Sequence, residues 1–388
     1  MDYTFTKDQE MIRKSAREFF IKECPKDRVR ELKDDPQAYD PLMWKKMVDL
    51  GFLGLIIPEM YGGMQGDLIE LMIFTEELGR NLVPCPFFGT VVECTVPLLK
   101  FGTDQQKQKY LTGIAEKGAI WSLAQAEQVA DFEAEDINLT AEADNGNFVL
   151  NGTKLFVPYA AEADFFIVAA RTNKIGDPRE GVTLFIVEAG AEGIGIEAMP
   201  TTARDCRGEV RFDGVRVTGD NVLGEQDQGW TILDTVLQHA AVFKAVEMSG
   251  GAQAVFDLTV NYARERKQFN KSIGSFQAVQ HKLVDLLTLV DGLKYLVYEA
   301  AWHMNNGTSS RGLNSMAKVK ANAVYHEVCH HGIVLHGAIG WTEEMDIGLY
   351  HIKTKAAQFD GGLSTLHLER IAAELEAYVP EYRKLYPG

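Results

Sequence analysis

A cluster of cations followed by an aromatic residue lies in the segment Tyr262–Gln277. Arg264, Arg266 and Lys267 are three cations within four positions, and Phe269 comes two residues later. An arginine can bind a phosphate through two parallel hydrogen bonds, and an aromatic side chain beside it can cover a planar ring. The segment therefore predicts a site for a nucleotide with a pyrophosphate, although a run of charges is also typical of a solvated helix end.

A second pattern could bind a metal. His326-Glu327-Val328-Cys329-His330 is a literal His-Glu-x-x-His sequence, which on a helix places two imidazoles on one face for zinc, with the glutamate as a base. His331 or His336 could supply a third ligand. The chain has nine histidines, which makes a coincidental match easy, and a helical bundle after a β-domain is an unusual setting for a zinc protease. We therefore expect no metal site.

Composition is typical of a soluble enzyme with two or three domains in 388 residues. There is no apolar run of 18 residues, which predicts no transmembrane helix, and no charged-then-apolar signal region at the N-terminus. The five cysteines are scattered and odd in number, as expected of reduced thiols in the cytoplasm. A net charge of −16 argues against a nucleic-acid partner.

The spacing of apolar residues changes twice along the chain. It is helical from Lys7 to about residue 116, strand-like from about 119 to 224, and helical again from Trp230 to about 375. In the middle part, residues 165–168, 183–187 and 210–212 are predicted strands, and Asn151-Gly152 predicts a hairpin turn. The order helices, strands, helices predicts an α+β protein.

The segment 262–277 reads Tyr-x-x-x-Arg-x-x-Phe and then Ile-Gly-x-Phe-Gln, which resembles the flavin-binding signature of the acyl-CoA dehydrogenase family. Further landmarks of that family follow its order over nearly the whole chain. They are Pro58–Gly63, Glu76–Arg80, Leu150–Lys154, Val222–Gly224, Gly229-Trp230, and His336-Gly337 with Gly340.

The resemblance implies an acyl-CoA dehydrogenase-like fold. Its parts are an N-terminal helical domain (1–118), a middle β-barrel-like domain (119–229) and a C-terminal four-helix bundle (230–388). It implies FAD between the β-domain and the bundle, with a neighbouring subunit of a homotetramer or dimer holding the pyrophosphate and adenine. It also implies an acyl-CoA substrate and electron-transfer flavoprotein as the acceptor.

The predicted catalytic base is Asp360. Removing the α-hydrogen of a thioester requires a carboxylate, which burial makes more basic. The resemblance places this group in an aromatic-Glu-Gly-Thr segment, and the matching residues here are Phe359-Asp360-Gly361-Gly362. An aspartate before two glycines is equally typical of a helix C-cap, so this alternative stays open.

Other members of the family carry the base on the first bundle helix, where this chain has Ala240. Glu247, seven residues on, is expected to share a helix face with Ala240 and Lys244 and is the second candidate base. Lys244 and Glu247 are more simply a surface i,i+3 pair. The resemblance places Ala130, Ala240 and Lys244 beside the substrate.

The resemblance assigns FAD contacts to two groups of residues. The phosphate-side group is Arg266, Phe269, Phe276, Gln277, Gly337 and Ala338, and the ring-side group is Leu123, Ala124, Phe156 and Pro158. Ala124 and Pro158 replace threonines that contact the flavin in the family, and neither offers a polar side-chain atom. We therefore expect backbone groups near Leu123 and Ala124 to hold the flavin edge.

Two functions are consistent with these residues. The first is FAD-dependent α,β-dehydrogenation of an acyl-CoA thioester, with a cyclic or branched acyl group as one option. The alternative is a catalytically impaired or flavin-poor subunit that pairs with an active paralogous subunit in a heteromeric acyl-CoA dehydrogenase.

Overall fold

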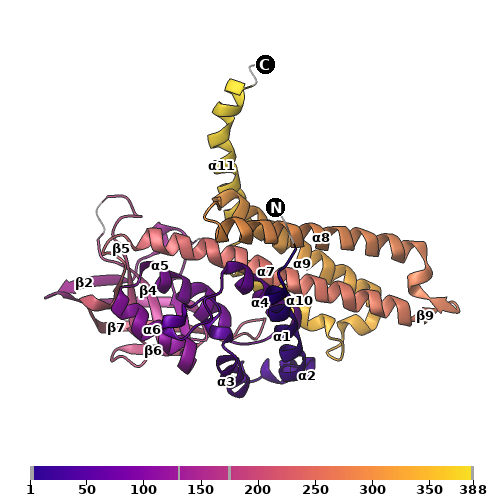
Figure 1. The fold of residues 1–388 in the computed structure, drawn as a ribbon, viewed down its shortest axis with the longest axis horizontal. Helices are drawn as coiled ribbons and strands as arrows, with labels where there is room; N and C mark the ends of the chain where they lie inside the picture. Colours follow the sequence, from indigo (N-terminus) through magenta and orange to yellow (C-terminus); the bar gives the residue numbers. More distant parts are fainter. Residues whose placement is uncertain (1–3, 130–131, 174–175, 386–388) are drawn as a thin grey trace. The chain divides into compact units, whose positions relative to one another are not determined.

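A computed structural model describes residues 4–129, 132–173 and 176–385 (Figure 1). The chain forms two compact units, and each unit is built from separate stretches of sequence. The first, helical unit contains residues 1–30, 67–83 and 240–388, and the second contains residues 31–66 and 84–239. The C-terminal helices therefore enclose a core together with helices from the N-terminal part.

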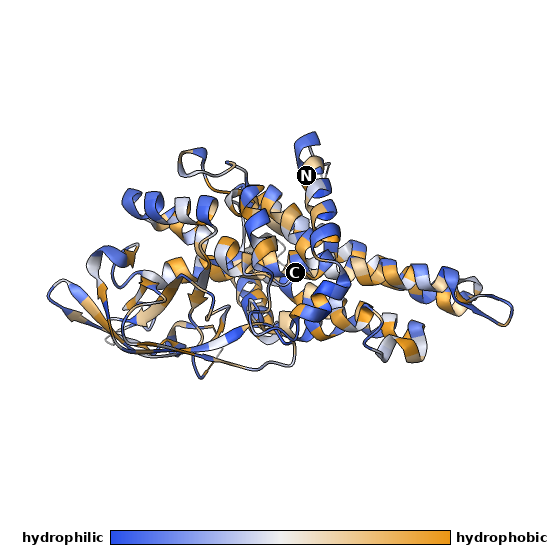
Figure 2. Ribbon diagram, turned by 90° about the horizontal axis from the view of Figure 1, so that it is seen from below, coloured by the Kyte–Doolittle hydropathy of each residue, from blue (hydrophilic) through white to orange (hydrophobic). Residues whose placement is uncertain are grey.

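Helices make up nearly all of the first unit, and the hairpin of β9 and β10 turns the chain from α7 into α8 (Figure 1). In Figure 2 every long helix contains both hydrophobic (orange) and hydrophilic (blue) residues, as expected of helices with one buried side. Its elements are α1 (Lys7–Glu23), α2 (Lys26–Leu32), α4 (Leu68–Asn81), α7 (Gly229–Glu265), β9 (Lys267–Gln268), β10 (Lys271–Ser272), η6 (Ile273–Ser275), α8 (Gln277–Asn305), α9 (Arg311–His336), η7 (Gly337–Trp341), α10 (Ile347–Phe359) and α11 (Ser364–Leu385), of which α2 and α7 continue into the second unit.

Within the first unit, α9 packs against α8, α10 and α11. Its buried side is mostly apolar, with Ala317, Ala321 and Val324 among its members, but it also carries the polar residues Lys318 and Asn322. A polar group on a buried helix face must find hydrogen-bond partners on the neighbouring helices. These partners lie at the end of α10 and the start of α11, where the predicted base is located.

Two glycines set the distance between α4 and α7. A Cβ atom on Gly79 would collide with the backbone oxygen of Glu247, and one on Gly250 would collide with the backbone oxygen of Glu76. The two helix backbones are therefore in direct contact. This contact fixes the turn of α7 that also carries Lys244.

The second unit is built on an eight-stranded sheet in the order β6-β7-β3-β2-β4-β5-β8, with β1 paired to β4. The predicted strands at 165–168, 183–187 and 210–212 are confirmed, and side chains such as Phe166, Phe185 and Phe212 form its core. Its elements are α3 (Pro41–Asp49), η1 (Phe52–Gly54), η2 (Glu59–Tyr61), η3 (Phe88–Thr95), α5 (Val96–Phe101), α6 (Asp104–Lys117), β1 (Trp121–Ala124), η4 (Ala134–Asp136), β2 (Thr140–Asp144), β3 (Asn147–Pro158), β4 (Phe165–Arg171), β5 (Val182–Glu188), β6 (Ile194–Ala198), β7 (Arg207–Thr218), η5 (Gly219–Asn221) and β8 (Val222–Leu223).

The hairpin prediction at Asn151-Gly152 is wrong, because β3 runs straight through these residues. The turn lies instead at Asn145-Gly146, between β2 and β3, where both residues have positive φ values of 50° and 84°. A two-residue hairpin turn requires positive φ at both central positions. Gly152 serves a different purpose, since it lies at a register shift between β3 and β7 and has φ 145°.

Aromatic packing fixes the start of β1. The ring of Trp121 stacks on Phe165 with centroids 4.7 Å apart and meets Tyr110 edge-on at 5.1 Å. The backbone N–H of Trp121 donates to the Thr90 hydroxyl at 3.0 Å. These contacts hold β1 in register and so determine where its last residues, Leu123 and Ala124, lie.

The observed order of helices, sheet and helices confirms the predicted α+β class. Across the described residues, no helix combines the length and the apolarity that crossing a bilayer requires. The five cysteines form no disulfide among the described residues.

The α4–α7 contact yields a first prediction. Gly250→Ala should lower the free energy of unfolding by about 3 kcal/mol, because the added methyl group forces two packed backbones apart. Gly292→Ala is the matched control: this exposed glycine within α8 has open space around a Cβ, and the change should stabilise the protein by up to ~1 kcal/mol. Chemical denaturation of both variants measures the difference, and equal effects would contradict the contact.

Candidate active site

The predicted phosphate-side residues Arg266 and Phe269 lie on the hairpin between α7 and α8 (Figure 1). Arg266 follows the last residue of α7 and is exposed, and in the described part of the chain its guanidinium has no hydrogen-bond or ion-pair partner. Phe269 is 87% exposed and has φ 53°, so it projects from the tip of the hairpin. A guanidinium and an uncovered ring are therefore available to a phosphate and a planar group.

A contact between α7 and α9 brings the other phosphate-side residues to the base of this hairpin. The hydroxyl of Tyr262 donates to the carbonyl oxygen of His336 at 3.2 Å, and the two rings stack with centroids 4.2 Å apart. Gly337 and Ala338 follow directly and are exposed. Gly337 has φ 70° and ends α9, a conformation that favours glycine.

Gln277 and Phe276 begin α8 on the other side of the hairpin. Gln277 is the exposed first residue of the helix, and Phe276 is its N-cap. The ammonium of Lys271 lies 4.2 Å from the centre of the Phe276 ring. The six phosphate-side residues are therefore all located at one end of the helical unit.

The ring-side residues belong to the second unit. The side chains of Leu123 and Ala124 are buried, and among the described strands β1 pairs with β4 alone. The hydroxyl of Ser122 donates to the carbonyl oxygen of Pro158 at 2.5 Å, which ties the end of β3 to β1. Phe156 is 49% exposed and adopts φ 54°. Ser122 is the nearby polar side chain that sequence reasoning did not identify.

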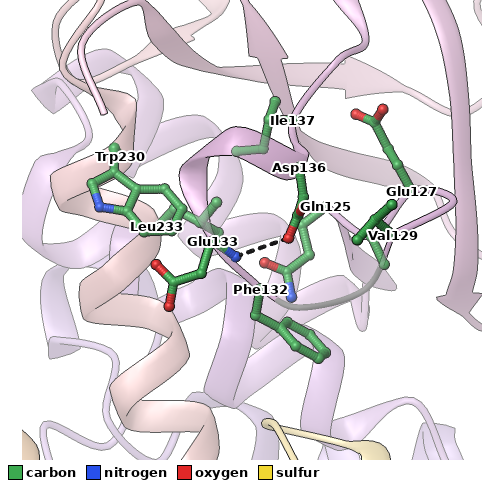
Figure 3. Close-up of a pocket in the computed structure, with 10 residues that line it drawn as sticks. Gln125, Glu127, Val129, Phe132, Glu133, Asp136, Ile137, Trp230 and Leu233 are labelled. Carbon is green, nitrogen blue, oxygen red and sulfur yellow. Dashed lines mark hydrogen bonds between the residues drawn. The ribbon is translucent and has the colours of Figure 1, made fainter. Parts of the chain in front are cut away.

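A shallow pocket lies beside the loop that follows β1 (Figure 3). Trp230 and Leu233, from the first turns of α7, line it together with Glu133, whose backbone N–H donates to the carboxylate of Asp136 at 3.3 Å. The remaining lining residues are Gln125, Ala126, Glu127, Val129, Phe132 and Ile137. Ala130, the predicted substrate contact of this loop, lies outside the described residues.

A buried ion pair holds this loop in place. The ammonium of Lys154, on β3, donates to the carboxylate of Glu127 at 2.7 Å and to the carbonyl oxygen of Gln125 at 3.0 Å. The same Glu127 oxygen accepts from the backbone N–H groups of Asn138 and Leu139, both at 3.0 Å. Burial lowers the pKa of Lys154 to about 8, against the attraction of Glu127. One ion pair therefore fixes both ends of the loop.

Asp360 ends α10 in the first unit. Its backbone N–H donates to the carbonyl oxygen of Ala356 at 3.3 Å, so Asp360 is the C-cap residue that the alternative interpretation expects. The carboxylate, 20% exposed, lies 3.5 Å from the ammonium of Lys244 on α7.

The turn after Asp360 lies against α7. Gly361 and Gly362 have φ values of 73° and 102°. A Cβ on Gly361 would lie 3.2 Å from the Cα of Ala241 and 3.3 Å from the carbonyl oxygen of Ala240. The structure thus brings together Asp360, Ala240 and Lys244, three of the predicted catalytic and substrate-side residues.

Lys244 and Glu247 form the expected i,i+3 pair, but the prediction that it is a surface pair is wrong. Their charged atoms are 2.6 Å apart, and their side chains are only 5% and 18% exposed. The pair is buried because neighbouring residues of α7, such as Val246 and Met248, are part of the core. Glu247 as the second candidate base stays a prediction.

The His-Glu-x-x-His residues lie on α9 without a common metal position. The carboxylate of Glu327 bonds to Nε2 of His331 at 2.8 Å, and the rings of His326 and His330 are 6.4 Å apart. No group of three or more His, Cys, Asp or Glu side chains in the described ranges is arranged to hold a metal ion.

Lys318 is the residue of this region that sequence reasoning missed. It is completely buried on α9, and its ammonium donates to the carbonyl oxygens of Ala357 and Gln358 at 2.9 and 3.4 Å. The signal in the sequence is a lysine on the apolar face of a helix, one position after Ala317. A charge in such a position must have several oxygen partners.

Comparison with known proteins agrees with the fold. Family models described as the N-terminal, middle and C-terminal domains of acyl-CoA dehydrogenase match residues 6–118, 122–215 and 227–376. The chain is 31% identical to a probable acyl-CoA dehydrogenase, YngJ, of Bacillus subtilis over 97% of this chain and 100% of that protein. It is 30% identical to subunit CarC of the caffeyl-CoA reductase-Etf complex of Acetobacterium woodii, over 88% and 91%. The structure of butyryl-CoA dehydrogenase from Megasphaera elsdenii matches with a TM-score of 0.90 at 27% identity, over 97% and 100%.

The chain therefore belongs to the acyl-CoA dehydrogenase family, whose members are FAD-dependent oxidoreductases. The resemblance and the fold predicted from the sequence are confirmed. The domain boundaries at 118 and 229 and the roles of the individual site residues stay predictions.

The buried Lys154–Glu127 pair yields a second prediction. Lys154→Met should lower the free energy of unfolding by about 3–5 kcal/mol near neutral pH, because it leaves a partly buried carboxylate without its cation. A lysine whose pKa falls to about 8 on folding makes stability rise with pH between about 8 and 10, and that gain is lost as the pH falls through 8. The loss caused by Lys154→Met should therefore grow over this range in denaturation curves, and a loss independent of pH would contradict the burial of a charged lysine.

Proposed function

We propose that the protein is an FAD-dependent dehydrogenase that oxidises an acyl-CoA thioester between its α and β carbons, with a cyclic or branched acyl group as one option. The observation that carries the proposal is the position of Asp360. Its carboxylate lies on a Gly-Gly turn against Ala240 of α7, with an ammonium 3.5 Å away. Proton abstraction needs a base, and small residues beside it leave room for a substrate to come within hydrogen-bond reach.

In the proposed reaction, Asp360 takes the α-proton of the thioester. The electron pair of that C–H bond becomes the second bond between the α and β carbons. The ammonium of Lys244 places a positive charge 3.5 Å from the carboxylate of Asp360. When bound, FAD supplies the acceptor for the hydride that leaves the β carbon.

Two groups of residues are proposed to contact FAD. The guanidinium of Arg266 would bind the pyrophosphate and Phe269 would cover a ring, with Phe276, Gln277, Gly337 and Ala338 around them. Backbone groups near Leu123 and Ala124 would hold the flavin edge, with Phe156 and Pro158 alongside. The exposure of Arg266 and Phe269 supports a nucleotide shared between two chains, and thus a homotetramer or dimer.

The proposed electron acceptor is electron-transfer flavoprotein. A relative of the chain is named as a subunit of a reductase-Etf complex, which supports this partner. A cytoplasmic location is also proposed, and the presence of five cysteines without a disulfide among the described residues supports it.

The second candidate function is an impaired partner of an active paralogous subunit. It is favoured by the absence of polar side-chain atoms at Ala124 and Pro158, and by the engagement of the Ser122 hydroxyl with Pro158. A flavin edge with fewer donors is harder to reduce.

A third prediction tests the base. Asp360→Asn keeps the shape and removes the proton acceptor, so flavin reduction by a matching acyl-CoA should slow by a factor of ~10²–10⁴ while FAD stays bound. Stopped-flow absorbance measures the rate, and Glu247→Gln is measured beside it. Unchanged reduction in Asp360→Asn and loss in Glu247→Gln would transfer the role to Glu247. Wild-type protein that holds FAD but is reduced by no class of acyl-CoA would favour the impaired partner.

A fourth prediction tests the phosphate site. Arg266→Ala should weaken FAD binding by ~1.5–3 kcal/mol, the scale of a charge-assisted hydrogen bond. Arg264→Ala removes the same charge two residues earlier on the same helix end and should have a much smaller effect. Titration of the apoprotein with FAD, followed by flavin fluorescence, gives both constants. A protein that carries no flavin and takes none up on reconstitution would overturn the assignment.

A further inference from the structure

The end of α10 is completed by a residue of another helix. The last four carbonyl oxygens of a helix have no partner within it, and in α10 these belong to residues 356–359. The outer two accept from backbone N–H groups of the turn itself. The inner two, of Ala357 and Gln358, accept from the single ammonium of Lys318. The direction of the chain as it leaves α10 therefore depends on a side chain of α9.

Two further residues of α9 hold the same turn. Ser315, Lys318 and Asn322 follow at intervals of three and four and so share one helix face. The amide of Asn322 donates to the hydroxyl of Ser364 at 3.0 Å, and its oxygen accepts from Lys318 at 2.7 Å. The hydroxyl of Ser315 bonds to Nδ1 of His367 at 3.1 Å. One stripe of α9 thus contacts both sides of the turn.

The imidazole of His367 closes this set of contacts. Its Nε2 lies 2.8 Å from the carbonyl oxygen of Gly361, the residue after Asp360, and therefore carries the proton and donates it. Its Nδ1 then accepts from Ser315. Burial lowers the pKa of His367 to about 4, so the ring stays neutral near pH 7.

Several charged groups surround Lys318 in this region. Lys244 and Glu247 face it from α7 and Asp360 from the end of α10, while its own charge acts on His367 of α11. Burial lowers the pKa of Lys318 to about 7, although the carboxylates oppose this effect. The charge next to the Asp360 turn therefore changes within the working range of an enzyme.

We propose that Lys318 is a positioning residue for Asp360: by binding the carbonyl oxygens of Ala357 and Gln358, it fixes where the carboxylate lies. This inference rests on the proposed function, since it assigns Lys318 a role toward the base named there. Lys318 is not expected to touch the substrate, because its ammonium donates its three hydrogen bonds to protein oxygens.

The test compares four variants of the full-length, FAD-loaded protein. Lys318→Met removes both the charge and the donors, and Lys318→Gln keeps amide donors without the charge. Lys320→Met makes the same chemical change two residues along α9 and is the matched control. Asp360→Asn reports on the base itself. The rate of flavin reduction by a saturating acyl-CoA is measured from pH 5 to 9, together with amide hydrogen exchange in residues 356–364.

In Lys318→Met, flavin reduction at pH 7 should be at least about tenfold slower, with the FAD content unchanged. The acid limb of the plot of rate against pH should move up by about one pH unit, because the carboxylate of Asp360 loses a nearby positive charge. Lys318→Gln should show the same shift with a smaller loss of rate. Exchange should become faster at the turn in both variants, and Lys320→Met should match the wild type.

Two results would overturn the inference. The first is a wild-type rate and pH profile in both Lys318 variants while Asp360→Asn is inactive; the base is then correct and the positioning role is wrong. The second is a rate of flavin reduction that falls equally at every pH in the Lys318 variants and in proportion to the FAD released or the protein unfolded. Such a loss would reflect a structural defect alone. If Asp360→Asn reduces flavin normally, the proposed base fails, and hydrogen exchange still decides whether Lys318 holds the turn.

Discussion

A buried ammonium group must be surrounded by oxygen atoms, and this requirement organises the chemical parts of the protein. Among the described residues, Lys154, Lys244 and Lys318 are the buried lysines. An ammonium without partners would cost several kcal/mol, so the chain around each lysine has to present carbonyl or carboxylate oxygens. In the second unit the result is that both ends of the loop after β1 are held, and in the first it is a fixed turn after α10. In both cases a charge inside one element determines the conformation of an irregular segment elsewhere in the chain.

The charges around the proposed base are balanced. Lys244 and Lys318 provide two cations, and Glu247 and Asp360 provide two carboxylates, all in the helical unit. This balance explains how four ionisable groups can share a mostly buried region. Burial lowers the pKa of Lys318 to about 7, so the charge of this lysine changes near neutral pH.

The sequence predicted the order of the elements and the family, because both depend on patterns that repeat or persist over many residues. It failed at Asn151-Gly152, where a local hairpin signal is overridden by the pairing of β3 with β7. It misjudged the exposure of the Lys244–Glu247 pair because periodicity alone does not tell which side of a long helix is covered. Lys318 could not be connected with Asp360 at all, since 42 residues separate them and only the packing of α9 against α10 brings them together.

The glycines at the crossing of α4 and α7 affect how related sequences should be interpreted. Gly79 and Gly250 face backbone atoms of the opposite helix, and neither has a side chain that could touch a ligand. An evolutionary lineage that kept the fold but lost its chemistry would have no reason to keep Asp360, yet it would still have to keep these two positions. Glycine at both positions in a related protein would therefore indicate that α4 and α7 are closely packed, and would not indicate that the protein is catalytically active.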